Sequence, residues 1–141
     1  MSGMEEADAQ ATATLRSGCA YVASTRVACE NCGRRIEVVC VYCESGVVDA
    51  EPLERFTAQQ IRAVDPDLAL QLRRWPGFRF DERYGCYLNH CGSCGAAQDE
   101  DALHGEPDRP FFDVPGAAGR AVRLSALAGT ITLVADYSAD V

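Results

Sequence analysis

Three Cys-x-x-Cys pairs are the feature that most constrains how this 141-residue chain can fold. Two cysteines at this spacing can bind one metal ion from a single tight turn. Disulfides are disfavoured because we expect the chain to reside in a reducing compartment, where cysteines bind metal or remain free thiols. The three pairs are Cys29 with Cys32, Cys40 with Cys43, and Cys91 with Cys94.

The amino-terminal sequence predicts a cytoplasmic protein. It carries Glu5, Glu6 and Asp8 where a signal peptide needs basic residues, and no long apolar run follows them. No stretch approaches the roughly eighteen apolar residues of a membrane span. Residues 1–18 show no apolar periodicity, so we expect a flexible tail there and a single domain over residues 19–141.

Two of the three pairs have a glycine directly after the second cysteine, namely Gly33 and Gly95. In a zinc knuckle, backbone amides after the first cysteine point at its sulfur. The residue after the second cysteine turns with positive φ, which glycine adopts at little cost. Two knuckles from distant parts of a chain form one tetrahedral four-thiolate site, the geometry that structural zinc prefers. The predicted ligands of one Zn²⁺ ion are therefore Cys29, Cys32, Cys91 and Cys94.

The pair of Cys40 and Cys43 is followed by Glu44 instead of glycine, and it lies in a valine-rich run typical of a buried strand. An odd separation places the two side chains on opposite faces of a strand. We therefore expect two buried, apolar cysteines rather than metal ligands or a redox dithiol. A local four-cysteine site that joins this pair to Cys29 and Cys32 is the alternative that the spacing leaves open.

The remaining cysteines and the first histidine are expected to be structural. Cys19 and Cys86 are isolated in the sequence and are predicted to lie in the core. His90 directly precedes Cys91, and we expect it to form a hydrogen bond near the metal rather than to bind it.

His104 follows three acids, Asp99, Glu100 and Asp101, a combination that occurs in catalytic metal sites. Four polar residues near one loop are more often a solvated face, which is the interpretation we favour. The sequence therefore predicts no catalytic residues, and we expect that the protein is not an enzyme.

The chain pattern predicts an α+β fold: a zinc-ribbon-like antiparallel sheet with two zinc knuckles and an inserted helical segment. Strands are expected up to Ala28 and over residues 36–43, 78–80, 86–89 and 130–134, with a hairpin turn at residues 29–33. A capping-box pattern at residues 57–60 predicts a helix from Thr57 to Val64. A second helix is expected from Asp65-Pro66 to Pro76-Gly77, with Leu68, Leu72 and Trp75 on its inner face.

Residues 87–107 carry the motifs N-H-C-x-x-C-G-A-x-Q and L-H-x-E-P, and residues 29–33 carry an earlier C-x-x-C-G. In this respect the chain resembles a group of small bacterial zinc-ribbon proteins, over roughly residues 20–113. The resemblance implies the same four metal ligands, Cys29, Cys32, Cys91 and Cys94. It implies a fold more than an activity.

The formal net charge of −8 disfavours a nucleic-acid backbone as partner, since that interaction needs a basic face. The predicted function is a non-enzymatic, zinc-stabilised protein-interaction module whose acidic surface binds a protein. An inhibitor or immunity-type protein that neutralises a basic partner is the concrete form of this hypothesis. Taken alone, the acid-rich residues 99–108 are expected to be a solvated face. If the protein captures a basic partner, these are the charges expected to speed association.

The alternative function is a nucleic-acid-binding zinc ribbon that acts in transcription or DNA uptake. Arg26, Arg34 and Arg35 flank the first knuckle and provide the cations that such a role requires. Glu30 and Glu37 interrupt this cluster, which is why the protein-interaction hypothesis is preferred.

Overall fold

Antiparallel β-strands make up most of the fold, with two short helices in the part of the chain that the structure describes. The computed structural model describes residues 12–105, 109–112, 114 and 122–139. No helix in these ranges is long and apolar enough to cross a membrane. The strands are β1 (Ala13–Ala28), β2 (Arg35–Val48), β3 (Glu51–Val64), β4 (Phe78–Asp81), β5 (Cys86–Asn89), β6 (Arg123–Ala126) and β7 (Ile131–Ala139). The helices are α2 (Pro66–Leu72) and α3 (Glu100–His104).

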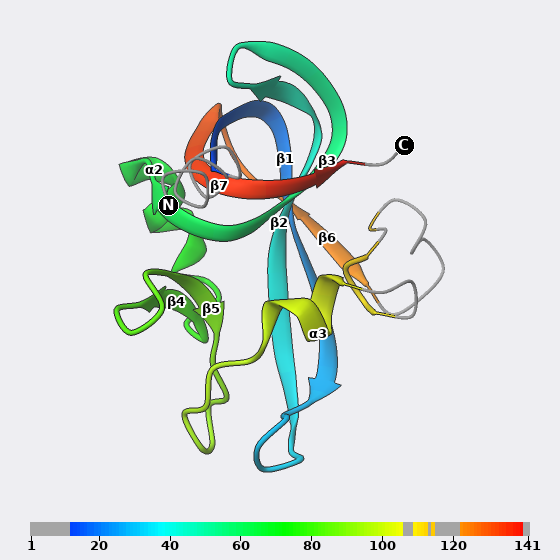
Figure 1. Ribbon diagram of the computed structural model, residues 1–141, viewed down its shortest axis with the longest axis vertical. Coiled ribbons are helices and arrows are strands. Elements are labelled where there is room, and N and C mark those ends of the chain that lie inside the picture. Colours follow the sequence, from blue (N-terminus) through cyan, green and yellow to red (C-terminus); the bar gives the residue numbers. More distant parts are fainter. Residues whose placement is uncertain (1–11, 106–108, 113, 115–121, 140–141) are drawn as a thin grey trace, which may run out of the picture.

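The main sheet closes on itself through β1, which pairs with β2 along one edge and with β7 and β6 along the other. Strand β3 joins β2 to β7, so β1, β2, β3 and β7 form a ring of hydrogen-bonded strands in the upper half of Figure 1. The register of β1 against β2 shifts between Arg16 and Ala20. A bulge of this kind bends a strand, and it divides β1 into a first half paired with β7 and a second half paired with β6.

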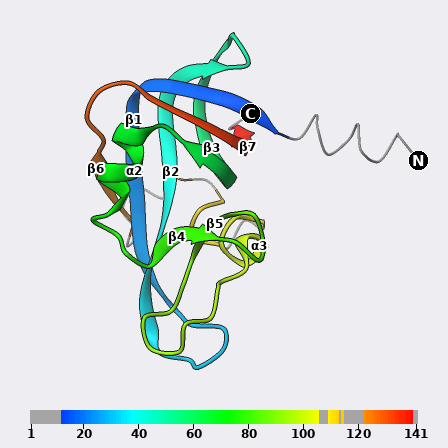
Figure 2. The same ribbon diagram turned by 90° about the vertical axis from the view of Figure 1, so that its left-hand side faces the viewer.

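Below the ring, the β1–β2 hairpin extends as a long two-stranded arm (Figures 1 and 2). The two-stranded sheet of β4 and β5 and the helix α3 lie beside this arm. The turn at the end of the arm and the loop after β5 come together at the lower end of the molecule. These two loops contain the two predicted knuckles.

Two hydrophobic clusters cover opposite faces of β2. Val39, Val41 and Cys43 belong to the cluster inside the ring, whereas Val38 and Cys40 belong to a second cluster with residues near α3. Because both faces are buried, the strand reads as a continuous apolar run instead of an alternating one. The predicted strand over residues 36–43 and the hairpin turn before it are confirmed.

Asn89, the last residue of β5, fastens the small sheet to the edge of β2 that β3 leaves uncovered. Its side-chain amide donates to the Val39 carbonyl and accepts from the Val39 N–H, both at 2.9 Å. Asn89 is only 2 % exposed, so these bonds form where water does not compete. The contact fixes the position of the second knuckle, because Cys91 follows two residues later.

The predicted helix from Thr57 to Val64 is wrong, since these residues lie in strand β3. Tertiary pairing with β2 and β7 overrides the local capping-box pattern, and Thr57 is buried between its neighbours. The register of β3 against β7 shifts between Gln59 and Ala63. A bulge changes the phase of an alternating strand, which explains why the apolar spacing around Ile61 resembled that of a helix.

The second predicted helix is confirmed in its start but is shorter than expected, since α2 ends at Leu72. Asp65 caps it by accepting a hydrogen bond from the Leu68 amide at 2.8 Å, and Pro66 occupies the first turn. Leu68 and Leu72 are buried on its inner face, and Trp75 is buried just beyond its end.

The predicted tail over residues 1–18 is too long. Residues 13–18 are part of β1, and Ala13, Leu15 and Ser17 are buried there in an alternating pattern. That alternation has the period of a strand, but two of its three buried positions are the small residues Ala13 and Ser17, which give little apolar signal in the sequence. Residues 1–11 lie outside the described residues.

Replacing Asn89 with leucine is expected to destabilise the fold by about 2 to 5 kcal/mol, because both polar groups of Val39 are left unpaired in the interior. Gln71→Leu is the matched control. The Gln71 amide makes the same two-way pairing with the backbone of Ala128, at 3.0 and 2.7 Å, but in an exposed position. Water can replace the Gln71 side chain as hydrogen-bond partner there, so the free energy of unfolding is expected to fall by less than about 1 kcal/mol. Urea unfolding of both variants measures the difference, and equal losses would contradict the docking role of Asn89.

Candidate metal centre

The two predicted knuckles have the same backbone geometry. Gly33 and Gly95 both have φ of 79°, as the sequence analysis expects. The Gly33 amide donates to the Cys29 carbonyl at 2.9 Å, and the Gly95 amide donates to the Cys91 carbonyl at 2.8 Å. Each glycine therefore closes its turn in a left-handed conformation that side-chain-bearing residues rarely adopt.

Backbone amides point at the sulfur of the first cysteine in each turn. The Asn31 amide lies 3.4 Å from Cys29 Sγ, and the Ser93 and Cys94 amides lie 3.3 and 3.4 Å from Cys91 Sγ. Donors in this arrangement stabilise a thiolate over a thiol. Both first cysteines are thus prepared to carry negative charge.

The four sulfur atoms of Cys29, Cys32, Cys91 and Cys94 all lie within 4.8 Å of one another. Cys29 Sγ is 3.6 Å from Cys94 Sγ, and Cys32 Sγ is 3.7 Å from Cys91 Sγ. These separations are far beyond a disulfide bond of about 2.05 Å. They match the edge of a tetrahedron around a metal with bonds of about 2.3 Å, which is about 3.8 Å. The cluster is therefore positioned to bind a metal ion, and it contains the four residues that the sequence predicted.

The pKa values of the four thiols are unequal. Hydrogen bonding from the Cys32 amide is the main reason that the pKa of Cys29 falls to about 6, and the Cys94 amide lowers the pKa of Cys91. The Arg34 amide lowers the pKa of Cys32, but burial and the neighbouring cysteines outweigh this and raise it to about 11. Four close sulfurs repel one another as thiolates, so full deprotonation needs a bound cation.

Gln98 connects the two knuckles and was not assigned this role from the sequence. Its Nε2 donates to Cys29 Sγ at 3.4 Å and to the Ala96 carbonyl at 3.0 Å, and its Oε1 accepts from the Glu30 amide at 3.1 Å. Gln98 is 3 % exposed. Such outer contacts orient metal ligands and tune the charge on them. Its position four residues after Cys94 in the N-H-C-x-x-C-G-A-x-Q motif was the only available signal.

Cys40 and Cys43 take no part in the cluster. They are 2 % and 0 % exposed and lie in different hydrophobic clusters on opposite faces of β2, as expected from their odd separation. Burial raises the pKa of both thiols, to about 12 for Cys43. The local four-cysteine alternative is therefore wrong. Cys86 is buried as predicted, whereas Cys19 is only half-buried.

His90 forms hydrogen bonds close to the second knuckle, as expected, and none of them reaches a sulfur. Its Nε2 lies 2.9 Å from Asp81 Oδ2, and its Nδ1 lies 3.2 Å from the Gly77 carbonyl. The bond to His90 is the main reason that the pKa of Asp81 is lowered. His90 thus ties the β4–β5 turn to the base of the knuckle.

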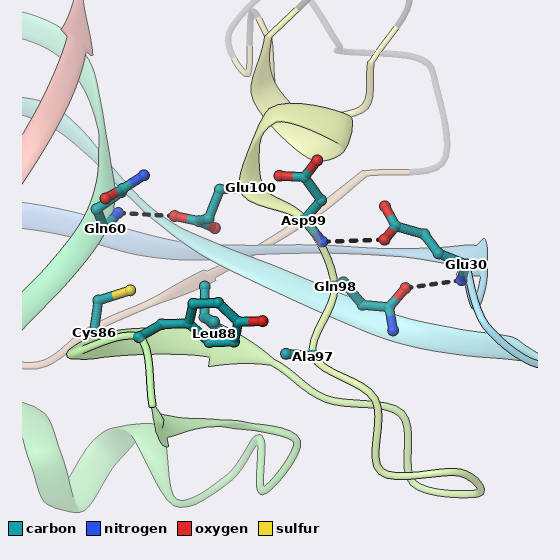
Figure 3. Close-up of a pocket in the computed structure, with 9 residues that line it drawn as sticks. Glu30, Gln60, Cys86, Leu88, Ala97, Gln98, Asp99 and Glu100 are labelled. Atoms are coloured by element: carbon teal, nitrogen blue, oxygen red, sulfur yellow. Dashed lines mark hydrogen bonds between the residues drawn. The ribbon is translucent and has the colours of Figure 1, made fainter. Parts of the chain in front are cut away.

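A cavity of about 450 Å³ opens beside the first knuckle (Figure 3). Its wall includes three carboxylates, those of Glu30, Asp99 and Glu100, and no arginine. The backbone N–H of Asp99 donates to the Glu30 carboxylate at 3.3 Å, and the backbone N–H of Gln60 donates to the Glu100 carboxyl group at 2.8 Å. The other lining residues are Gln60, Tyr84, Cys86, Leu88, Ala97 and Gln98.

The expected solvated face at residues 99–104 is wrong for Glu100 and His104, whose side chains are only 11 % and 2 % exposed. Burial is the main reason that the pKa of Glu100 rises to about 7, and the charges of Asp99 and Asp101 add to the rise. Burial lowers the pKa of His104 to about 4. Between about pH 4 and pH 7 the Glu100 carboxyl group is therefore protonated and His104 is neutral, so the two side chains, 3.8 Å apart, are both uncharged. Glu106 and Asp108 lie outside the described residues.

The chain matches no family model, and neither the curated proteins nor the solved structures include a significant match to it. The four-cysteine cluster that the resemblance implies is present, but no family is identified.

Replacing one ligand should release the metal, because binding free energy at such a site is also folding free energy. Cys94→Ser is expected to bind no metal and to lose cooperative unfolding, whereas Cys43→Ala should keep one ion per chain. The second change leaves a cavity in the core and should cost at most about 1 to 3 kcal/mol. Elemental analysis and thermal unfolding measure the two effects. Loss of metal from Cys43→Ala, or retention by Cys94→Ser, would contradict this assignment.

Glu100→Gln is expected to stabilise the protein, and more so at high pH. The folded state binds the Glu100 proton more tightly than the unfolded chain, whose pKa is near the usual 4.5. At a pH below about 4.5 the carboxyl group is protonated in both states and does not lower the free energy of unfolding. At a pH well above 7 it is ionised in both states and lowers the free energy of unfolding by about 3 kcal/mol.

The measurement is the difference in unfolding free energy between variant and wild type, by urea, at about pH 5 and about pH 8. Taking the difference at each pH cancels the titration of the metal ligands and most of that of His104. The control is Glu82→Gln at an exposed turn position, which should show the same small effect at both pH values. A difference for Glu100→Gln that does not grow with pH would contradict the buried-carboxyl interpretation.

Proposed function

We propose that the metal is Zn²⁺ and that the protein is a non-enzymatic, zinc-stabilised interaction module that binds a basic protein partner. Four thiolates in tetrahedral geometry are the donor set that zinc prefers among divalent metals. Two glycine-closed knuckles from distant segments are the arrangement of a zinc ribbon. X-ray absorption of the purified protein should show zinc with four sulfur neighbours, and nitrogen or oxygen neighbours would contradict it.

A structural role for the zinc follows from its closed coordination. Catalytic zinc sites keep one position open for water or substrate, whereas the four clustered cysteine sulfurs would fill all four positions of a bound zinc ion. The ion instead joins the tip of the β1–β2 arm to the loop after β5. It thereby holds Glu30, which follows Cys29, against Asp99, which follows Gln98.

The acidic cavity beside the zinc site is the observation that carries the proposed partner. Glu30, Asp99 and Glu100 all line it; Glu30 and Asp99 are exposed, whereas the Glu100 side chain is largely buried. Three carboxylates with no arginine among the lining residues suit the guanidinium or ammonium group of an inserted side chain. Gln60 and Tyr84 supply neutral polar and aromatic contacts at the same cavity.

The protonation of Glu100 supports a role in binding. A buried carboxyl group with a pKa near 7 costs stability at neutral pH, and such groups cluster at functional sites. A partner cation placed in the cavity offsets this cost by stabilising the carboxylate. Binding is therefore expected to release a proton and to strengthen as the pH rises through 7.

An inhibitor or immunity-type protein is the form of this proposal that fits the chain best. Charges around the cavity would speed encounter with a basic partner, and the rigid zinc site would hold them in place for docking. The overall charge of −8 acts in the same direction.

The test is to isolate the partner from the source cells at low salt and to measure association rates across salt concentrations. A variant with Glu30→Gln, Asp99→Asn and Glu100→Gln is expected to associate at least about tenfold more slowly at low salt. Asparagine at position 99 still caps α3, so the helix is retained.

The matched control removes three exposed carboxylates elsewhere, at Glu51, Glu54 and Glu82, by changing each to glutamine. Like the cavity variant, it makes the net charge less negative, and by at least as much because Glu100 is only partly ionised near pH 7, but it leaves the cavity intact. Equal rates for the cavity variant and the control would exclude the cavity as the contact site. A partner without a basic surface would contradict the proposed function itself.

A further inference from the structure

The face of the β1–β2 arm that carries Arg26 and Arg35 also gathers a third arginine from the far end of the sequence. In the sheet, Ser24 of β1 lies opposite Arg123 of β6, and Arg26 lies opposite Glu37 of β2. Paired residues, and residues two apart along a strand, point to the same face. Arg35, two residues before Glu37, therefore joins them.

These side chains line a hollow of about 360 Å³, within the usual size range of small-molecule sites. Its charged lining residues are Arg26, Arg35 and Arg123 against the single carboxylate of Glu37. Within the described part of the chain, none of the three guanidinium groups forms an ion pair. Arg26 instead donates to the Arg35 carbonyl at 3.4 Å.

Convergence of three cations that form no ion pair with any described residue is unfavourable without a further counter-charge. It is also unexpected in a protein whose net charge is −8. The hollow shares Arg26, Arg35 and Glu37 with a second one of about 340 Å³, which runs toward Trp75 and Ser93. The arginines therefore lie along a groove rather than on a flat, solvated sheet face.

We propose that this groove binds a compact ligand through a phosphate group. Three guanidinium forks offer more donors than the two oxygens of a carboxylate can accept, whereas a phosphate presents three terminal oxygens and about two charges. Arg26, Arg35 and Arg123 hold the phosphate, and the continuing groove accommodates the rest of the ligand. This site is separate from the acidic cavity and does not depend on the proposed protein partner.

The charge distribution favours a small ligand over a nucleic-acid strand. Screening limits the reach of the three arginines to about 8 Å at physiological salt. A strand longer than this would extend its phosphates past Glu37 and over a surface that is acidic overall. Three phosphate contacts also give a polyanion little affinity compared with proteins that make six to ten.

The experiment is an NMR titration of the zinc-loaded full chain with inorganic phosphate, adenosine 5′-monophosphate and adenosine, in a phosphate-free buffer. Saturable shifts are expected at Ser24, Arg26, Arg35 and Arg123 with the two phosphate-bearing probes and not with adenosine. Arg35→Gln and Arg123→Gln should each weaken binding about tenfold, which corresponds to about 1.4 kcal/mol. If the monophosphate binds more tightly than inorganic phosphate, the groove also contacts the rest of the ligand. If the two bind equally, the protein recognises the phosphate group alone.

The matched control is Arg83→Gln, which removes the same charge from an exposed turn that lines neither hollow. Equal weakening by this control would overturn the site, because it would show a general charge effect. Absence of saturable shifts at the four residues would do the same. A single-stranded oligonucleotide that binds more tightly than the monophosphate at physiological salt would overturn the compact-ligand proposal in favour of nucleic acid.

Discussion

The convergence of four cysteine sulfurs is the constraint on which the lower half of the molecule depends. The sulfurs come from two loops separated by more than fifty residues, and they lie at the spacing of a tetrahedral metal site. Without a cation, four thiolates this close would repel one another. Two neutral amide side chains support the arrangement: Asn89 docks β5 on β2, and Gln98 bridges the two knuckles. The four-cysteine cluster and the strand pairing are therefore parts of one structural unit.

The same arm contributes charges of opposite sign to two separate hollows. Glu30, at its tip, contributes to an acidic cavity with Asp99 and Glu100, whereas Arg26 and Arg35 contribute to a basic groove with Arg123. The formal net charge of the whole sequence, −8, indicates only an acidic protein and does not reveal that the charges are separated in this way. Because screening confines each group of charges to its neighbourhood, the proposed ligands of opposite charge would bind at the two places independently.

Local sequence was reliable where the backbone itself imposes the conformation. Gly33 and Gly95 mark turns of positive φ, and Asp65-Pro66 marks the start of α2, because these residue types have few alternatives there. Local sequence gave the wrong secondary structure where the strands that pair with a segment determine its conformation. The capping-box pattern at residues 57–60 is compatible with a helix, but the ring of strands needs β3 between β2 and β7, and a bulge imitates helical spacing.

The sequence by itself determined which four cysteines form the cluster, since paired cysteines with a following glycine have a distinctive spacing and conformation. It also determined the burial of Cys40 and Cys43 on opposite faces of a strand. Only the tertiary structure decided which charged groups are buried and which converge. Glu100 and His104 are buried because α3 packs beside the arm, and Arg123 lies near Arg26 because β6 pairs with β1. Burial and cross-strand neighbours arise from contacts between distant segments, and no local pattern encodes them.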